Sequence, residues 1–245
     1  MTSTLAESYL GDAGDFLLIN RFAARTGWLH AAMTGYAATY GLVVLVVLLL
    51  VGWWLARRSG ELRAMAALAW AGLGTLVAVG VNQPIVNAVA EKRPYASIPD
   101  TLLLVGRSAD YGFPSDHAVM AGAVATGLCY VNRRLGVTAW AAAVLLAFAR
   151  VYVGAHYPHD VVAGLVVGAA VVVLGQFLAR PILTWLLTRL ARTPLRPLLV
   201  AGRGEPTTTA TDAPAGSPGA TVARGVGHRG GSGRARRDGR LEVPR

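Results

Sequence analysis

Three short polar segments interrupt a chain that is otherwise rich in Ala, Val, Leu and Gly. They are Lys92-Arg93-Pro94, Pro114-Ser115-Asp116-His117, and the segment from Arg150 through His156 to Asp160. An ionisable side chain at the centre of a membrane helix costs roughly 2.5–3.5 kcal/mol on insertion scales, so such residues among apolar helices indicate function. Cations can hold an anion, one histidine can act as a nucleophile, and another can transfer a proton.

The third segment places an acid behind a histidine. His156 and Asp160 are four residues apart, so on a helix or a helical turn they lie on the same face. A carboxylate bound to one imidazole nitrogen fixes the tautomer and makes the other nitrogen a better base or nucleophile. Arg150 precedes His156 by six residues, and a short loop through Gly154 would bring its guanidinium beside the imidazole. A guanidinium is a planar fork that matches phosphate or carboxylate oxygens, which predicts an anionic substrate.

The second segment places another histidine at the start of a helix. Ser115 and the free N–H groups of that helix start can bind anion oxygens, because the helix dipole points there as well. His117 can donate a proton, and Arg93 and Lys92 add cationic donors from the preceding loop. Together these groups are an inventory for phosphoryl transfer without a metal. We therefore expect neither a metal ion nor another cofactor.

In these residues the chain resembles the type 2 phosphatidic acid phosphatase (PAP2) superfamily of membrane phosphatases. The motifs of that family are Lys-x6-Arg-Pro, Pro-Ser-Gly-His and Ser-Arg-x5-His-x3-Asp. Residues 91–160 contain a counterpart of each, in the same order: Arg93-Pro94, Pro114 to His117, and Arg150 to Asp160.

The sequence departs from the family pattern at three positions. Val86 stands where the first motif has its Lys, Asp116 stands in place of Gly, and Ala149 in place of Ser. Lys92 is a candidate replacement for the missing Lys. The Pro-Ser-Asp-His form, with a Glu-x-Arg-Pro-Tyr first motif at 91–95, is similar to the undecaprenyl-diphosphatase branch linked to bacitracin resistance.

The resemblance implies a role for each site residue. His156 attacks phosphorus and forms a phosphohistidine, Asp160 orients it, and His117 protonates the leaving oxygen. Asp116 either steers a neighbouring cation or contacts the second phosphate through a proton or a water. The family needs no metal. The residues expected at the substrate phosphates are Arg93, Lys92, Ser115, Arg150 and Asp116.

Composition predicts an all-α integral membrane protein. The chain has 245 residues, of which 54% are hydrophobic and 15% are charged, whereas a soluble domain has about 25% charged residues. The single cysteine, Cys129, excludes a disulfide within the chain.

Five apolar runs predict five spanning helices, with a sixth if residues 12–30 insert, and the resemblance implies that they form a PAP2/haloperoxidase-like bundle. A bilayer core needs about 20 apolar residues in a helix, and the third and fourth runs are shorter. We expect flanking motif residues to complete these two helices; a re-entrant hairpin over 117–149 is the alternative. The runs are approximately 33–56, 64–90, 117–132, 135–149 and 161–179.

The chain divides into three regions. Residues 1–32 are predicted to be a polar segment followed by an amphipathic helix at the membrane interface. Residues 33–192 are predicted to be the transmembrane phosphatase domain. Residues 193–245 are predicted to be a disordered basic tail, because they are rich in Pro, Gly, Thr and Arg and have almost no aromatic residues.

Arginine placement predicts the orientation of the helices. The connections after the first and third runs are basic, and from Arg180 onward twelve arginines face four acidic residues, a net charge of +8. Basic connections belong on the cytoplasmic side, so the tail is expected there. The loop 91–116 and the segment 150–160 then share the extracytoplasmic face of the plasma membrane.

The leading functional prediction is hydrolysis of undecaprenyl diphosphate to undecaprenyl phosphate and phosphate, which recycles the carrier lipid of cell-wall synthesis. Within the enzymes, the alternative is a phosphatidic acid or phosphatidylglycerophosphate phosphatase. A rival of another class is a transporter or binding protein for anionic lipids. The expected partners are the lipid substrate and membrane lipid, without nucleic acid, and the oligomeric state is not predicted.

Overall fold

The computed structural model describes residues 2–201, with side chains described from residue 13 onward; residues 202–245, most of the predicted tail, lie outside the described residues. All secondary structure in the described part is helical. The longer helices are α1 (Thr2–Arg25), α3 (Gly41–Ser59), α4 (Leu62–Val89), α6 (Asp116–Cys129), α7 (Arg133–Tyr152), α8 (Pro158–Leu178) and α9 (Arg180–Leu190). The short ones are η1 (Gly27–Leu29), α2 (His30–Gly35), η2 (Tyr36–Tyr40), α5 (Pro94–Ser97) and α10 (Arg196–Leu199).

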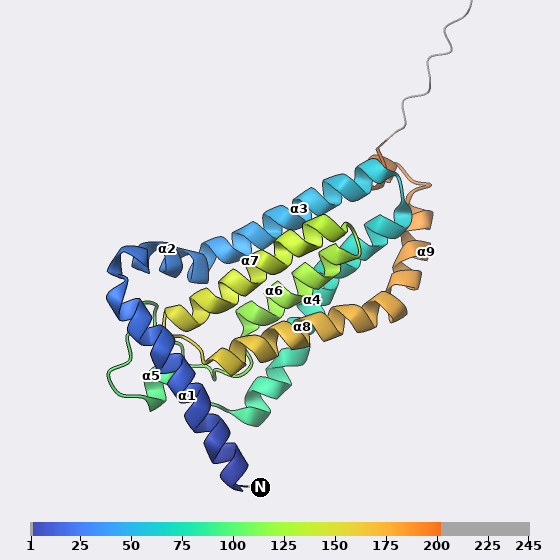
Figure 1. Ribbon diagram of the computed structural model, residues 1–245. Coiled ribbons are helices and arrows are strands. Elements are labelled where there is room, and N and C mark those ends of the chain that lie inside the picture. The colour runs from blue at the N-terminus through green and yellow to red at the C-terminus, as the bar shows by residue number, and fades with distance from the viewer. Residues whose placement is uncertain (1, 202–245) are drawn as a thin grey trace, which may run out of the picture. The chain divides into compact units, whose positions relative to one another are not determined.

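The five predicted runs correspond to helices α3, α4, α6, α7 and α8, which confirms the helical bundle. Helix α6 lies at its centre and contacts α8, α7, α4 and α3 (Figure 1). Nearly every residue of α6 from Ala118 to Leu128 is buried. Most of these residues are Ala, Gly or Val, and such small side chains let neighbouring helices approach closely.

The contact between α6 and α8 is close enough to involve backbone atoms. A Cβ on Gly164 would lie 2.7 Å from the carbonyl oxygen of Ser115, and one on Gly168 would overlap the carbonyl oxygen of Val119. At the start of the two helices, the N–H of Ser115 donates to the carbonyl oxygen of Asp160 at 3.1 Å. The second and third motifs are therefore joined through main chain.

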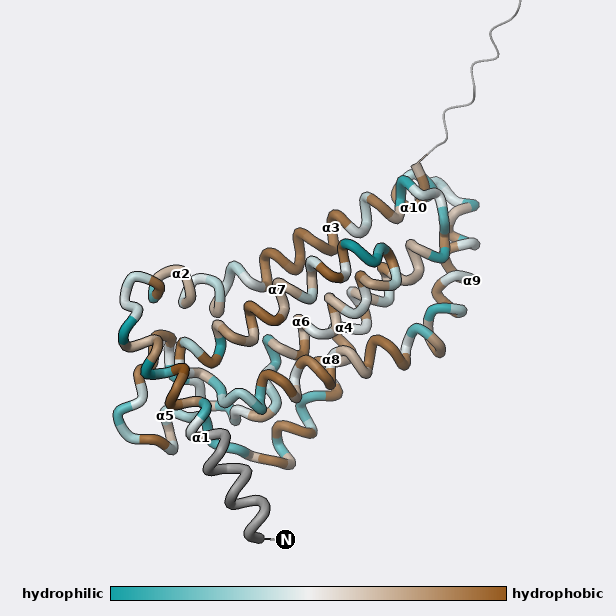
Figure 2. Tube along the Cα trace, in the orientation of Figure 1, coloured by the Kyte–Doolittle hydropathy of each residue, from teal (hydrophilic) through white to brown (hydrophobic). Residues whose placement is uncertain are grey.

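Several helices are long and apolar enough to cross a membrane. They occupy Gly27–Ser59, Leu62–Ser97, Arg133–Tyr152 and Pro158–Leu178. Figure 2 shows hydrophobic residues along α3, α7 and α8, and many on α3 and α8 are exposed, as expected for side chains that face lipid. Helix α7 reaches Tyr152, as predicted from its flanking motif, whereas α6 has only 14 residues. At about 1.5 Å per residue, α6 is shorter than a bilayer core of about 30 Å.

The first helix packs against the end of the bundle that carries the motifs. Helix α1 begins at Thr2, within the segment that the sequence predicts to be polar. The ring of Phe16 is buried against that of Tyr157 with centroids 5.5 Å apart. Asn20 donates to the carbonyl oxygen of Leu102 at 2.9 Å and accepts from its N–H at 3.1 Å. Insertion of this region into the membrane stays a prediction.

The three motifs lie at one end of the bundle. The loop 90–115 connects α4 to α6, and the turn 153–157 connects α7 to α8; both are at the end near α1 and α5 (Figure 1). The α3–α4 and α6–α7 connections lie at the opposite end, near α9. The sequence prediction that two distant motifs share one end is confirmed; the side of the membrane stays a prediction.

Candidate active site

The turn between α7 and α8 brings Arg150 to His156. Gly154 in this turn has a φ of 80°, a left-handed conformation that glycine adopts readily. A Cβ at this position would also overlap the carbonyl oxygen of Leu102. As a result, Nη2 of Arg150 lies 3.2 Å from Nε2 of His156. The proximity predicted from the six-residue spacing is confirmed.

His156 is 2% exposed and is held from its Nδ1 side. Nδ1 lies 3.0 Å from the carbonyl oxygen of Gly112 and 3.2 Å from Oδ2 of Asp160. Both oxygens are acceptors, so we assign the proton to Nδ1, which leaves the lone pair on Nε2. The N–H of Tyr157 donates to the same Asp160 oxygen at 2.9 Å and fixes the carboxylate.

The surroundings of His156 favour a neutral imidazole. Burial, and then the charges of Arg150 and Arg93, lower the pKa of His156 well below its ordinary value. The ring is therefore unprotonated on Nε2 at neutral pH. This is the form that can attack phosphorus.

Arg93 uses all three guanidinium nitrogens. Its Nη1 lies 3.0 Å from Nε2 of His156 and donates to the carbonyl oxygen of Ala155 at 3.2 Å. Its Nε and Nη2 donate to the carbonyl oxygen and to Oδ2 of Asp110, at 3.2 and 3.1 Å. Burial raises the pKa of Asp110, but a hydrogen bond from Ser108 and the charge of Arg93 outweigh it, so that this pKa is lowered. Asp110 thus stays ionised and orients Arg93.

Arg150 is held from the side of the π-helix η2. Its Nη1 donates to the carbonyl oxygen of Ala37, which lies in η2, at 3.4 Å. The hydroxyl of Tyr36 anchors the same segment by donating to the carbonyl oxygen of Ala142 at 3.1 Å. Single-turn π-helices are often found at functional sites. Here one supplies a backbone acceptor for a buried guanidinium.

The start of α6 places its three predicted site residues differently. Ser115 is fully buried, and its hydroxyl has no hydrogen-bond partner among the described residues. Asp116 is turned toward α4, where it accepts hydrogen bonds from Asn82 at 2.8 Å and Gln83 at 3.1 Å. His117 is half-buried and lines the cavity described next.

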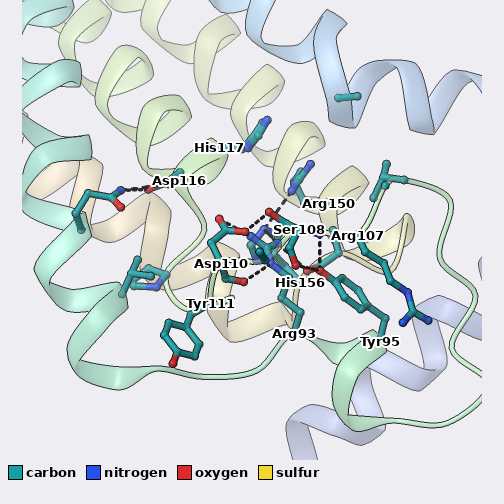
Figure 3. Close-up of a pocket in the computed structure, with 18 of the residues that line it drawn as sticks. Arg93, Tyr95, Arg107, Ser108, Asp110, Tyr111, Asp116, His117, Arg150 and His156 are labelled. Atoms are coloured by element: carbon teal, nitrogen blue, oxygen red, sulfur yellow. Dashed lines mark hydrogen bonds and ion pairs between the residues drawn. The ribbon is translucent and has the colours of Figure 1, made fainter.

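A cavity of about 840 Å³ has His156, Arg93 and Arg150 in its lining. This volume is in the range of small-molecule sites. In Figure 3, Arg93, Asp110 and His156 gather at its centre, with Arg150 and His117 above them. Lys92 is exposed and is not among the residues that line the cavity, so its predicted contact with phosphate stays a prediction. The lining includes Arg93, Asp116, His117, Arg150 and His156.

The cavity is lined by both apolar and basic residues. Val86, at the position where the family motif has Lys, lines the cavity, so this position faces the site without a charge. Arg107 also lines it, and its guanidinium carbon lies 5.7 Å from the centre of the Tyr95 ring. The apolar lining residues are suited to the first carbons of a lipid chain: Ala38, Val79, Val86 and Met120.

Sequence reasoning missed several groups of the site. Gly112 and Ala37 act through backbone carbonyls, and residue type carries no signal for such a contact. Asp110 had a signal, since it lies in the loop between the first two motifs, but its contact with Arg93 needs the fold of that loop.

Replacing Arg93 by Lys tests the importance of the guanidinium fork. We expect a drop in kcat/KM of about 10²-fold, because an ammonium cannot reproduce donation to Asp110 and to a phosphoryl oxygen together. Lys92→Ala is the matched control, since its side chain is exposed and outside the cavity. The rate of phosphate release, measured at several substrate concentrations, gives kcat and KM for each variant. An equal loss in both variants would instead place Lys92 at the substrate.

Comparison with known proteins identifies the domain. The sequence profile of the PAP2 superfamily matches residues 67–181. Undecaprenyl-diphosphatase BcrC of Bacillus subtilis is 30% identical over 132 residues, which are 54% of this chain and 66% of that protein. Undecaprenyl-diphosphatase of Sulfolobus acidocaldarius is 32% identical over 95 residues, 38% of this chain and 46% of that protein. Phosphatidylglycerophosphatase B of Bacillus subtilis is 28% identical over 158 residues, 59% of this chain and 72% of that protein.

The chain spans less than two thirds of the length of the first two relatives. The range matched by the profile nevertheless contains every residue at the centre of the cavity, namely Arg93, His117, Arg150, His156 and, behind the imidazole, Asp160. Residues 67–181 of this chain are therefore a PAP2 superfamily domain.

Proposed function

We propose that this protein is a membrane lipid phosphatase that acts through a phosphohistidine on His156. The observation that carries the proposal is the geometry at Nε2. This unprotonated nitrogen faces the cavity within 3.0 Å of Arg93 and 3.2 Å of Arg150. Phosphoryl oxygens bound by the two guanidiniums would lie against the nucleophile, which is the positioning that phosphoryl transfer requires.

The reaction runs in two steps. Nε2 of His156 attacks the terminal phosphorus, the bond to the bridging oxygen breaks, and His117 gives its proton to the leaving lipid oxygen. Water then attacks phosphorus and passes a proton to His117, the N–P bond breaks, and inorganic phosphate leaves. Asp160 holds the Nδ1 proton of His156 throughout, and Arg93 and Arg150 stabilise the charge on the phosphoryl oxygens.

Undecaprenyl diphosphate is the substrate we propose, with undecaprenyl phosphate and phosphate as products. Two relatives that match the domain are named undecaprenyl-diphosphatase. The cationic cavity, with apolar residues also in its lining, suits a diphosphate that remains attached to a long hydrocarbon chain. The similarity to phosphatidylglycerophosphatase B supports a glycerophospholipid phosphate as the second candidate.

We place the site on the extracytoplasmic face of the plasma membrane and the tail in the cytoplasm. The support is the distribution of arginines, since the helix ends opposite the site carry Arg57 and Arg58 in the last turn of α3 and Arg133 and Arg134 in the first turn of α7. A protease applied from outside intact cells should cut a site engineered into the loop 90–115 and spare the basic tail.

Purified protein should release phosphate from undecaprenyl diphosphate while EDTA is present. The expected activity in EDTA is undiminished, because the groups proposed to stabilise the phosphoryl charge are guanidiniums rather than a metal. Phosphatidic acid and phosphatidylglycerophosphate are the comparison substrates, with kcat/KM measured for each. Complete dependence on added divalent metal would contradict the histidine mechanism, and a strong preference for a glycerophospholipid would favour the second candidate substrate.

A further inference from the structure

A second cluster of ligand-type side chains lies behind the nucleophile, on the side of Asp160 away from the cavity. Nε2 of His159 lies 2.9 Å from Oε2 of Glu91 and 3.2 Å from Oδ1 of Asp160. One imidazole nitrogen and two carboxylate oxygens thus converge on one point, all within 4.8 Å of one another.

The two carboxylates of this cluster are buried, and each has an oxygen that accepts no hydrogen bond from the described residues, Oε1 of Glu91 and Oδ1 of Asp160. The side chains of Glu91 and Asp160 are 6% and 0% exposed. Oε1 of Glu91 is buried without a hydrogen-bond partner among the described residues. A buried carboxylate oxygen that lacks a partner is unfavourable unless a cation satisfies it. A divalent ion would balance the charge of both carboxylates at once.

The cluster is also held rigidly before any ion arrives. The ring of His159 stacks on the ring of Tyr157, with the two centroids 5.6 Å apart. It also packs against the ring of Phe113, with a centroid distance of 5.3 Å. The second oxygen of Asp160 is fixed by the N–H of Tyr157, and the carbonyl oxygen of Glu91 accepts from the N–H of Gly112 at 2.8 Å. Partners of this kind, one step removed from the ligands, orient metal ligands and raise affinity.

We propose that Glu91, His159 and Asp160 form an inhibitory site for Zn²⁺ or a similar divalent transition-metal ion. One nitrogen and two carboxylate oxygens are a ligand set that zinc accepts, with bonds of about 2.0–2.2 Å. Ligand atoms bound tetrahedrally at that length are about 3.3 Å apart, close to the 2.9 and 3.2 Å between His159 and the two oxygens. The side chain of His159 is 34% exposed, which leaves an entry path and room for water as a fourth ligand.

Metal binding at this site would reach the reaction through Asp160. The same carboxylate accepts from Nδ1 of His156 through its other oxygen. A divalent cation on Oδ1 withdraws electron density from the carboxylate and weakens its hold on the Nδ1 proton, so Nε2 becomes a poorer nucleophile. The inhibition rests on the proposed function, whereas the binding does not.

Binding is tested first, independently of activity. Full-length, untagged protein stripped with EDTA and desalted is dialysed against micromolar Zn²⁺, and bound zinc is measured by elemental analysis. We expect one tight zinc per chain, with the affinity at least tenfold weaker in both Glu91→Gln and His159→Gln. His30→Gln is the matched control, because among the described residues its imidazole bonds to the Ala23 carbonyl and packs against the Tyr152 ring, outside the cluster, and the change should leave binding unaffected. No tight zinc in the wild type, or equal binding in all variants, overturns the site.

Inhibition is tested second. For each variant, the rate of phosphate release in the presence of zinc is divided by the rate of the same variant without zinc. Zinc should inhibit the wild type and His30→Gln, and the concentration for half inhibition should rise at least tenfold in His159→Gln. Zinc that binds without slowing phosphate release would overturn the inhibitory role. Tight zinc binding by a protein that releases phosphate from none of the lipids would keep the metal site and refute the proposed phosphatase.

Discussion

His156→Gln should abolish phosphate release, with kcat falling at least about 10³-fold, because the covalent route loses its nucleophile. Glutamine is the replacement of choice for a side chain that is only 2% exposed. Its amide oxygen can still accept from Arg93 and Arg150, and its N–H₂ can donate to Gly112. The fold should therefore survive, which circular dichroism and size-exclusion chromatography in detergent would check.

The companion variant His117→Gln separates the two histidine roles. With an aryl phosphate, whose leaving group needs no proton, the loss in His117→Gln should shrink while the loss in His156→Gln remains. Protein quenched in alkali after reaction with ³²P-labelled substrate should carry label in the wild type and none in His156→Gln. Substantial turnover by His156→Gln would contradict the phosphohistidine mechanism. Lipid movement without phosphate release, unaffected by this substitution, would favour a transporter.

Gly168→Ala should separate α6 from α8 and reduce both stability and activity. The new Cβ would overlap the carbonyl oxygen of Val119 and lie 2.8 Å from the nitrogen of Ala123, and backbone atoms cannot rotate away. Overpacking of this kind costs about 1–3 kcal/mol or more. Because α6 carries His117 and α8 begins beside His156, a shift of about 1 Å between the helices would lower kcat about 10²-fold.

Gly80→Ala in α4 is the matched control, since a Cβ there meets nothing within 4 Å. Alanine favours a helix over glycine by about 1 kcal/mol, so this variant should be as stable as the wild type or slightly more so. Thermal unfolding in detergent and phosphate release are measured for both variants, and together they test how close the contact between α6 and α8 is. A Gly168→Ala protein with wild-type Tm and kcat would show that the helix contact is looser than described.

The sequence predicted the helices and the pairing of motifs because both depend on local pattern. The apolar runs predicted the positions of α3, α4, α6, α7 and α8. The spacing of His156 and Asp160 predicted that they lie on one face, and the structure shows their side chains 3.2 Å apart. The run length correctly marked α6 as short, but the expectation that flanking motif residues would complete it was wrong, because a central helix buried by its neighbours can be shorter than a lipid-facing one. The short run 117–132 therefore gained little from its flanking motif residues.

The rest of the site depends on tertiary contacts that residue types do not encode. Asp116 lines the cavity, and its carboxylate also accepts hydrogen bonds from Asn82 and Gln83 on α4, so its contact with the substrate phosphates stays a prediction. The sequence alone does not indicate this contact, because Asn82 and Gln83 are more than 30 residues away from Asp116. The pairing of Glu91 with His159 likewise joins residues 68 positions apart, a contact that needs the folded loop.

The loop residues 105–111 form one side of the cavity, and from Gly106 onward their side chains are exposed. The nucleophile and its acid, in contrast, are buried at the start of α8, where main chain and glycine contacts hold them. Under the proposed function, the exposed side chains of this loop would contact the headgroup, while the buried imidazole would carry out the chemical step; Asp110 links the two through Arg93. Substitutions on one surface loop can retune which lipid is accepted without any repacking of the interior, a route by which one catalytic centre can acquire new substrates.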